Sequence, residues 1–411
     1  MQIVLAEHFR DTDLGREAKA ILGPCVQCGY CTPVCPTYRL LEDEWDGPRG
    51  RIHLIKQLLE GAEPSANLQL HLDRCLTCRS CETTCPEGVR YGRLLDIGRE
   101  LVEASPQRPL KERMARRALR AVLPYRYRFT ALLRIGQAMR RFLPDALRSM
   151  IPDRRPAGTW PDRAHARTML VWQGCVQPAL APDINAATAR VLDRFGIRLI
   201  PAKAGCCGAL SHHMTATEEA LAFMRRNIDA CWPHIEAGVE AIVMTASGCG
   251  AHVRDYGHLL RDDPQYGAKA KRFSELTRDI AEIVTLEWKD GMPPVPPAPP
   301  RRIAFQSPCS LQHGQKLNGV VEKLLKRAGF RLAPVAYPFL CCGSAGSYSI
   351  LQPALAESLR EQKLKTLLAT RPSMIATANI GCLMHLAATA PVPVRHWIEL
   401  LDETLAAADT S

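Results

Sequence analysis

Hydrophobic and polar positions follow the same order twice in the C-terminal part of the chain. Each copy alternates three short apolar runs with three amphipathic stretches that have the 3.6-residue spacing of helices. The copies begin with ARTMLVWQGC and RRIAFQSPC, and matching cysteines are 133 to 135 residues apart. Every apolar run is followed by cysteine: Cys175, Cys206, Cys207 and Cys249 in the first copy, and Cys309, Cys341, Cys342 and Cys382 in the second.

This alternation predicts an α/β fold with two duplicated βαβαβα domains, each built on a parallel sheet covered by helices. The expected bounds are 166–290 and 302–411, joined by a stiff linker at 291–301 that is rich in proline. Ligands of such sheets bind in the crevice outside the carboxyl ends of the strands. We therefore expect the four sulfurs of each copy to converge on one crevice.

The doubled cysteines in AGCCGALSHH and LCCGSAGSYS are poor disulfide candidates, because adjacent Cα atoms are only about 3.8 Å apart. Neighbouring side chains of a strand point to opposite faces, so both sulfurs reach one ligand only if the chain bends at once. Gly208 and Gly343 follow the doublets and permit that bend. A metal or cluster held by several thiolates is the favoured interpretation, while buried structural cysteines and a redox-active thiol site remain open.

Some histidines near these crevices have a counterpart in the other copy, and others do not. His252 and His385 both follow a crevice cysteine in the pattern C-x-x-H, so each is a candidate ligand, proton donor or packing residue. His212 and His213 have no counterpart in the second copy, and we expect them to be loop residues. Cys231 also lacks a counterpart and lies in a helical pattern, which predicts a core position.

The N-terminal part of the chain carries two runs of the form C-x2-C-x2-C-x3-C-P. This spacing is typical of bacterial two-cluster ferredoxins, in which three cysteines of a run hold one [4Fe-4S] cluster and the fourth holds the other. A pair of zinc sites is the weaker alternative, since zinc modules present separated C-x2-C pairs. The predicted ligands are Cys25, Cys28, Cys31 and Cys85 for the first cluster, and Cys75, Cys78, Cys81 and Cys35 for the second.

These runs predict a helical ferredoxin-like module over 1–104. Its spacer contains a turn at Gly47-Pro48 and a helix from Arg49 to Glu60, and Arg49 and Arg51 either raise the cluster potential or begin a solvated helix. A basic helical bridge follows at 105–165. Its amphipathic stretches are compatible with packing between domains, with an acidic partner and with an anionic membrane surface.

Composition narrows the function further. Seventeen cysteines in a chain without a signal-peptide pattern favour metal binding over disulfides, and no apolar run is long enough to span a membrane. The net charge of +11 is not accompanied by a nucleic-acid-binding motif. Dinucleotide and P-loop motifs are also lacking, and we identify no catalytic residue, so the sequence predicts an electron relay whose substrate chemistry lies on another polypeptide.

The two ferredoxin runs followed by two C…CCG…C repeats resemble the iron-sulfur subunits of glycolate oxidase (glycolate dehydrogenase) over essentially the whole chain. Matching stretches include HLDRCLTCRSCETTCP, TASGCG, LCCGSAGSY and VRHWIE. The resemblance implies FAD-containing partner subunits that oxidise glycolate, and D-lactate as well. It also implies a respiratory acceptor such as quinone, and a cytoplasmic location at the inner face of the inner membrane.

Related subunits of lactate, glycerol-3-phosphate and heterodisulfide metabolism share this architecture, so they are the alternatives. In heterodisulfide reductase the CCG motifs end in C-x-x-C, whereas this chain has His252 and His385 at those last positions. The departure weakens any transfer of that cluster type, and of thiol/disulfide chemistry, to this chain.

Overall fold

The computed structural model describes residues 1–103, 108–142, 144, 148, 151–288 and 301–408, which form two compact units. The first unit comprises Met1–Arg117, His213–Thr215 and Tyr337–Lys363, and the second comprises Ala118–His212, Ala216–Ala336 and Leu364–Ser411. The predicted proline-rich linker lies outside the described residues except for Arg301. The domain boundaries expected from the sequence stay a prediction.

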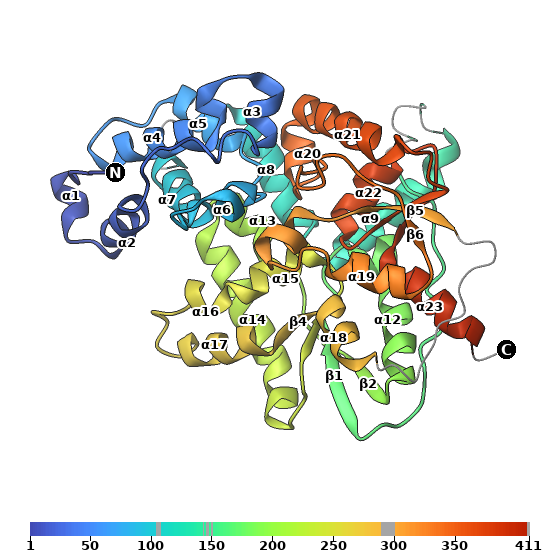
Figure 1. Ribbon diagram of the computed structural model, residues 1–411. Coiled ribbons are helices and arrows are strands. Elements are labelled where there is room, and N and C mark those ends of the chain that lie inside the picture. The colour runs from blue at the N-terminus through green and yellow to red at the C-terminus, as the bar shows by residue number, and fades with distance from the viewer. Residues whose placement is uncertain (104–107, 143, 145–147, 149–150, 289–300, 409–411) are drawn as a thin grey trace. The chain divides into compact units, whose positions relative to one another are not determined.

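The first unit is helical, as the ferredoxin-like pattern predicts. Its centre is the amphipathic helix α4, which begins at Pro48 and buries Ile52, Ile55 and Leu59 against α7. Figure 1 shows its N-terminal helices in blue to cyan and α20 in orange. They are α1 (Glu7–Arg10), α2 (Asp13–Leu22), α3 (Pro36–Leu41), the 3-10 turn η1 (Glu44–Asp46), α4 (Pro48–Leu59), α5 (Ala66–Asp73), α6 (Ser80–Thr84), α7 (Tyr91–Glu103) and, from the C-terminal repeat, α20 (Tyr348–Leu351).

The basic bridge forms two helices, α8 (Leu110–Val122) and α9 (Arg126–Met139), and a 3-10 turn η2 (Arg140–Phe142). Neither helix contains a buried residue. On α9 and η2 the side chains of Leu132, Ile135, Met139 and Phe142 are 50% to 71% exposed, at the spacing of one helix face. The amphipathic pattern of the bridge therefore leaves an apolar face uncovered among the described residues.

The second unit contains two four-stranded parallel sheets with the same strand order, β2-β1-β3-β4 and β6-β5-β7-β8. This confirms the predicted α/β class and the duplication. Each sheet also has a fourth strand that was not part of the βαβαβα pattern. The strands are β1 (Arg167–Val171), β2 (Ile197–Pro201), β3 (Ile242–Met244), β4 (Thr277–Asp279), β5 (Arg302–Gln306), β6 (Arg331–Leu332), β7 (Met374–Thr377) and β8 (Val394–His396).

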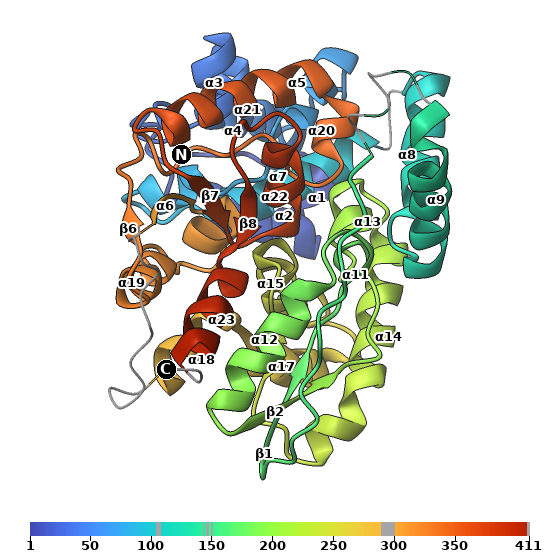
Figure 2. The same cartoon turned by 90° about the vertical axis from the view of Figure 1, so that its right-hand side faces the viewer.

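Helices cover both sheets, and α12 packs against α23 in Figure 2. The first sheet has α11 (Gln177–Leu180), α12 (Asp183–Arg194), α13 (Ala209–His213), α14 (Thr217–Glu236), α15 (Ser247–Arg254), α16 (Tyr256–Leu259), α17 (Gly267–Leu276) and α18 (Ile280–Glu287). The second has the π-helix η3 (Ser310–Gly314), α19 (Val320–Arg327), α22 (Ile380–Ala387) and α23 (Trp397–Ala408). Helix α21 (Pro353–Leu368) belongs to the first unit up to Lys363 and to the second from Leu364. Cys231 lies in the core beneath the first sheet, which confirms its predicted position.

The fourth strands end in different titratable residues at matching positions. Asp279 ends β4 and caps α18, and burial raises its pKa to about 6. His396 ends β8, and burial lowers its pKa to about 4 although its Nε2 donates to the Thr245 carbonyl at 3.0 Å. The folded protein therefore favours a protonated acid at one position and a neutral base at the other.

These two shifts predict opposite pH trends in stability. The contribution of Asp279 is full below about pH 4 and is lost as the pH rises through about 6, whereas that of His396 is full above about pH 6.5 and is lost as the pH falls through about 4. Each trend amounts to about 3 kcal/mol over its span. We expect the free energy of unfolding of Asp279→Asn to rise more steeply with pH than that of the wild type. In His396→Asn the slope with pH should change in the opposite direction.

Urea unfolding of the full chain from pH 4 to 7, followed by circular dichroism under anaerobic conditions, measures both slopes. The exposed ion pair of Arg49 with Glu44 supplies a control, because Glu44→Gln removes a charge without a buried partner. Parallel pH profiles for Asp279→Asn, His396→Asn and the wild type would contradict this account of the two strand ends.

Candidate iron-sulfur sites

The two ferredoxin loops follow the same backbone path. The second residue after the first cysteine has a positive φ in both loops, +55° at Gln27 and +54° at Thr77. The residue after the second cysteine does so as well, with φ +82° at Gly29 and +58° at Arg79. Left-handed residues turn the chain tightly, which lets the three sulfurs of a loop face the same side.

Two cavities in the first unit are lined by the eight cysteines, and Cys81 lies in the walls of both. One is lined by the four sulfurs predicted for the first cluster, together with Cys81, Arg49 and Tyr91. The other is lined by the four predicted for the second cluster, together with Arg51 and Tyr91. The crossed pattern follows from the course of the chain. Cys35 is the N-cap of α3 and Cys85 is the C-cap of α6, so each lies outside the tight loop of its own run.

The thiol groups themselves fit an iron-sulfur cluster. Burial raises the pKa of Cys31 to about 11 and that of Cys81 well above its usual value, and neighbouring sulfurs add to both shifts. Thiolates in such a setting need a cationic partner, and iron supplies it. Hydrogen bonds reach the sulfurs from the protein: the Tyr91 hydroxyl donates to Cys75 Sγ at 3.7 Å, and Thr37 Oγ1 lies 3.3 Å from Cys35 Sγ.

A buried ion network lies beside the second cavity. Arg51 is 1% exposed and donates to Thr37 Oγ1 at 3.1 Å, to Asp46 Oδ1 at 3.2 Å and to the His71 carbonyl at 2.7 Å. Its Nη1 is 4.0 Å from Cys35 Sγ. Asp46 also accepts from Arg74 at 2.7 Å. The two arginines flagged by the sequence thus differ, since Arg51 is buried and Arg49 forms an exposed pair with Glu44.

The four cysteines of the first repeat lie together at the carboxyl edge of the first sheet. Cys175 follows β1, the doublet follows β2, and Cys249 lies in the first turn of α15 after β3. Side-chain hydrogen bonds link Cys175 to Cys206, Cys206 to Cys207, and Cys207 to Cys249. The strand-end pattern therefore predicted their convergence correctly.

The pKa values of these thiols are shifted in opposite directions. Hydrogen bonds from Cys175 and Cys207 lower the pKa of Cys206 well below its usual value, and the Gly208 amide, 3.5 Å from its sulfur, adds to the effect. The pKa values of Cys175 and Cys207 are raised by the same contacts and by burial. A thiolate with thiols beside it is a donor set suited to a metal ion or a cluster.

Glycine shapes both doublets, as the sequence predicts. Gly208 has φ +89° and Gly343 has φ +92°, and in each case the glycine amide is 3.5 Å from the first sulfur of the doublet. A Cβ at Gly343 would lie 2.6 Å from the Ala356 carbonyl oxygen, closer than real contacts allow. In the first copy the doublet carbonyls also accept hydrogen bonds, from Asn227 to Cys206 and from Tyr256 to Cys207.

The histidines are arranged differently from the sequence expectation. His212 and His213 belong to helix α13, so the prediction that they are loop residues is wrong. The helix can form directly after the doublet because Gly208 reverses the chain. The His212 ring lies 5.3 Å from that of His252, which is buried on α15 three residues after Cys249. His212 was therefore missed as a neighbour of the first crevice, because the second copy has no equivalent.

The second copy divides between the two units. Cys341 and Cys342 are buried in the first unit, within a segment that contains α20, whereas Cys309, Cys382 and His385 belong to the second. Cys309 precedes η3, and Cys382 and His385 lie on α22. The Asn379 amide donates to Cys382 Sγ at 3.6 Å.

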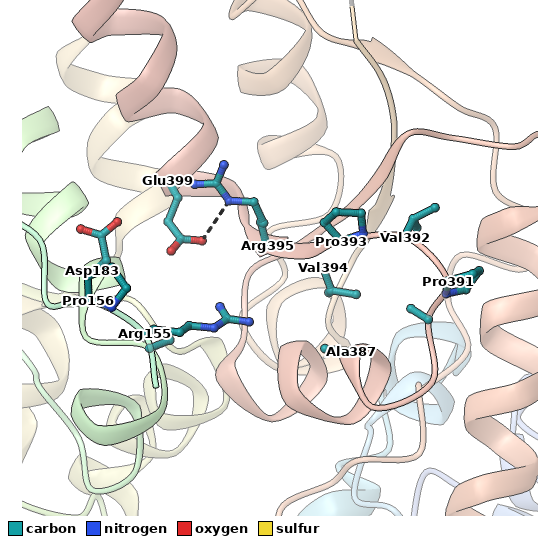
Figure 3. Close-up of a pocket in the computed structure, with 12 residues that line it drawn as sticks. Arg155, Pro156, Asp183, Ala387, Pro391, Val392, Pro393, Val394, Arg395 and Glu399 are labelled. Atoms are coloured by element: carbon teal, nitrogen blue, oxygen red, sulfur yellow. Dashed lines mark ion pairs between the residues drawn. The ribbon is translucent and has the colours of Figure 1, made fainter. Parts of the chain in front are cut away.

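A larger cavity of about 670 Å³ lies in the second unit, and none of the residues that line it is a cysteine. Figure 3 shows Arg395 and Glu399 on one side of it and Arg155 and Asp183 on the other, with the Arg395–Glu399 ion pair drawn as a dashed line. Its lining offers no group that carries electrons. We therefore place the candidate chemistry at the cysteines.

Comparisons with known proteins agree with this placement. Residues 21–89 match the family described as a 4Fe-4S dicluster domain, and residues 169–254 and 303–387 each match the cysteine-rich domain family CCG. A crystal structure of a hypothetical protein from Helicobacter pylori has a TM-score of 0.56 at 10% identity, covering 96% of this chain and 73% of that one. The structural likeness shows the fold alone. The chain is thus an iron-sulfur protein with a dicluster module and a duplicated cysteine-rich domain.

Full-length relatives are more specific. The glycolate oxidase iron-sulfur subunit of Escherichia coli is 52% identical over 98% of this chain and 99% of its own length. The probable glycolate oxidase iron-sulfur subunit of Bacillus subtilis is 31% identical over 88% and 87%. Lactate utilization protein A of an Exiguobacterium species is 25% identical over 56% and 94%. The chain belongs to the family of glycolate oxidase iron-sulfur subunits.

Proposed function

We propose that this chain is the electron-transfer subunit of a flavin-dependent glycolate dehydrogenase that also oxidises D-lactate. FAD-containing partner subunits carry out the substrate chemistry, and electrons pass through this chain to a respiratory acceptor such as quinone. The observation that carries the proposal is that eight cysteines of one module line two adjoining cavities, each of which contains one predicted set of four, with Cys81 in both walls. The family adds the substrate, because the E. coli relative, which matches 98% of this chain, is named for glycolate oxidase.

The residue assignments are part of the proposal. Four thiolates are proposed to hold each [4Fe-4S] cluster, in the crossed sets predicted from the spacing. The four cysteines of the first crevice are proposed to hold a further metal or cluster, with His252 beside them. The same is proposed for Cys309, Cys341, Cys342, Cys382 and His385 of the second copy. Bound clusters supply one-electron uptake and release, and the chain holds, shields and orients them.

The test of this function compares the chain alone with the assembled complex. Glycolate should bleach the visible absorbance of the clusters only when the flavoprotein subunits are present, and dithionite should bleach it in both cases. D-Lactate should act in the same way, and glycerol 3-phosphate should not. Reduction of the isolated chain by glycolate would overturn the proposed division of labour between subunits.

We further propose that the subunit contacts the anionic inner face of the membrane through α9. None of the helices that the structure describes is both long and apolar enough to span a bilayer. The exposed face of Leu132, Ile135, Met139 and Phe142 is flanked by Arg128, Arg134, Arg140 and Arg141, the arrangement of helices that lie in the lipid interface.

Substitution on this face predicts a loss of vesicle binding. Changing Ile135 and Met139 to Glu should lower the affinity for vesicles containing anionic phospholipid at least tenfold, because two apolar side chains that would enter the lipid interface are lost and charge repulsion is added. Vesicle co-sedimentation of the full chain measures this, with Leu286→Glu as the control because that side chain is 73% exposed elsewhere. The double variant and Leu286→Glu are compared on neutral and on anionic vesicles. If the two variants bound both kinds of vesicle equally well, α9 would not be the contact.

A further inference from the structure

The two ferredoxin loops share a backbone path but differ sharply in exposure. Val26, Cys28 and Tyr30 of the first loop are exposed, with Val26 at 66% and Tyr30 at 65%. The matching residues of the second loop, Leu76, Cys78 and Ser80, are 5%, 8% and 1% exposed. The first cluster set therefore opens to the surface through an apolar loop, whereas the matching loop of the second set is buried.

The charges around the two sets differ as well. The first cavity has Arg49 in its wall, but this side chain is exposed and paired with Glu44 at 2.6 Å. The second loop is flanked by two buried guanidinium groups. Arg51 lies 4.0 Å from Cys35 Sγ, and Arg99 donates to Thr77 Oγ1 at 3.2 Å and to the Cys75 carbonyl at 2.8 Å.

Their acceptors leave a net positive charge beside the second set. Asp46 and Asp43, whose carboxylate oxygens lie within 4.8 Å of each other, together balance Arg51 and Arg74. The hydrogen-bond acceptors of Arg99 are the neutral Thr77 hydroxyl and the carbonyls of Leu72 and Cys75, so its charge is in excess. Buried charges are only weakly screened, so they stabilise an added electron nearby much more than an exposed, paired arginine does.

From these contrasts we infer a direction of electron flow through the ferredoxin module. The exposed loop Val26–Tyr30 is the docking surface for the partner that presents the reduced flavin, and electrons enter there. Arg51 and Arg99 give the second set the higher reduction potential, so electrons move inward from the first set to the second. This inference rests on the proposed function, because it takes a flavoprotein as the electron donor.

The partner is identified by the chemistry of the loop. A ligating cysteine at the centre of an exposed apolar patch gives a donor protein the close approach that electron transfer needs, and exposed apolar side chains beside such a site are typical of protein contacts. A small-molecule donor would not need the flanking valine and tyrosine. A second copy of this chain in place of the flavoprotein is an outcome that the binding experiment distinguishes.

Redox titration followed by electron paramagnetic resonance tests the direction on the full anaerobic chain. Arg99→Gln should make the second set about tenfold harder to reduce, a shift of about 59 mV for one electron, and leave the first unchanged. Arg99→Lys should restore the potential because it keeps the charge. Arg16→Gln is the control and should change neither signal, because Arg16 forms an exposed pair with Asp13 at 2.6 Å and lines neither cavity. Equal shifts in both signals, or no shift with Arg99→Gln, would overturn the assignment.

Binding to purified FAD-containing glycolate oxidase subunits tests the surface. Tyr30→Glu should weaken the complex about thirtyfold. The control is Tyr127→Glu, an equally drastic change at a side chain that is 88% exposed outside the ferredoxin module. If Tyr30→Glu bound the flavoprotein with wild-type affinity, the docking surface would be wrong. It would also be wrong if Tyr30→Glu abolished self-association of this chain instead of flavoprotein binding. Failure of the wild type to bind flavoprotein would instead contradict the proposed function, while the titration would still stand.

Discussion

Replacing Cys85 with alanine is expected to remove the first cluster and leave the second in place. Cys85 belongs to the second cysteine run, yet it lines the cavity of Cys25, Cys28 and Cys31. A cluster that loses one of four thiolates in a water-accessible site is expected to be labile. Iron should fall by about four atoms per chain, and the electron paramagnetic resonance signal of one cluster should disappear.

The reciprocal variant makes this prediction sharp. Cys35→Ala should remove the second cluster, because Cys35 lines the other cavity with Cys75 and Cys78. Each variant should therefore erase the signal that the other retains. Cys231→Ala is the control, since that cysteine is buried in the core of the second unit and should change neither signal. If Cys35→Ala and Cys28→Ala erased the same signal, the runs would hold their clusters separately and the crossed assignment would be wrong.

Much of the candidate site could be predicted because its geometry is local. The spacing within each cysteine run fixes a tight loop, and the left-handed residues at Gln27 and Thr77 lie where that spacing requires a turn. The strand ends of the first repeat could be predicted for the same reason, since an apolar run followed by cysteine and glycine defines both the strand and its bend. The glycines after both doublets do have positive φ.

The remaining features depend on contacts between distant segments. Strand β4 has the sequence TRD, and such a polar sequence does not predict a strand. It forms one, partly buried at the sheet edge, because it pairs with β3. The environment of Arg99 is equally invisible in the sequence, because it lies 22 residues from Thr77 and reaches it only through the packing of α7. No local pattern assigns Tyr337–Lys363 to the first unit.

Removal of the Asp46 charge is expected to destabilise the ferredoxin-like unit more than any other single charge change considered. Asp46 is fully buried and accepts hydrogen bonds from Arg51 at 3.2 Å and Arg74 at 2.7 Å, and His71 Nδ1 is 3.1 Å from the same carboxylate. In Asp46→Asn, the guanidinium of Arg51 keeps its charge but loses its counterion in a site without water contact. Breaking a buried pair in this way costs about 3–5 kcal/mol.

Chemical denaturation of the cluster-loaded chain measures this cost, and iron retention reports whether the second cluster survives. Glu44→Gln breaks a pair of similar length between exposed partners and should cost less than about 1 kcal/mol. Both variants replace one carboxylate by an amide opposite an arginine. A difference in their losses of unfolding free energy therefore reports the effect of burial and not of the charge change itself. A loss in Asp46→Asn no larger than in Glu44→Gln would mean that Arg51 is not held by Asp46, and that its position beside Cys35 is set by Thr37 and the His71 carbonyl instead.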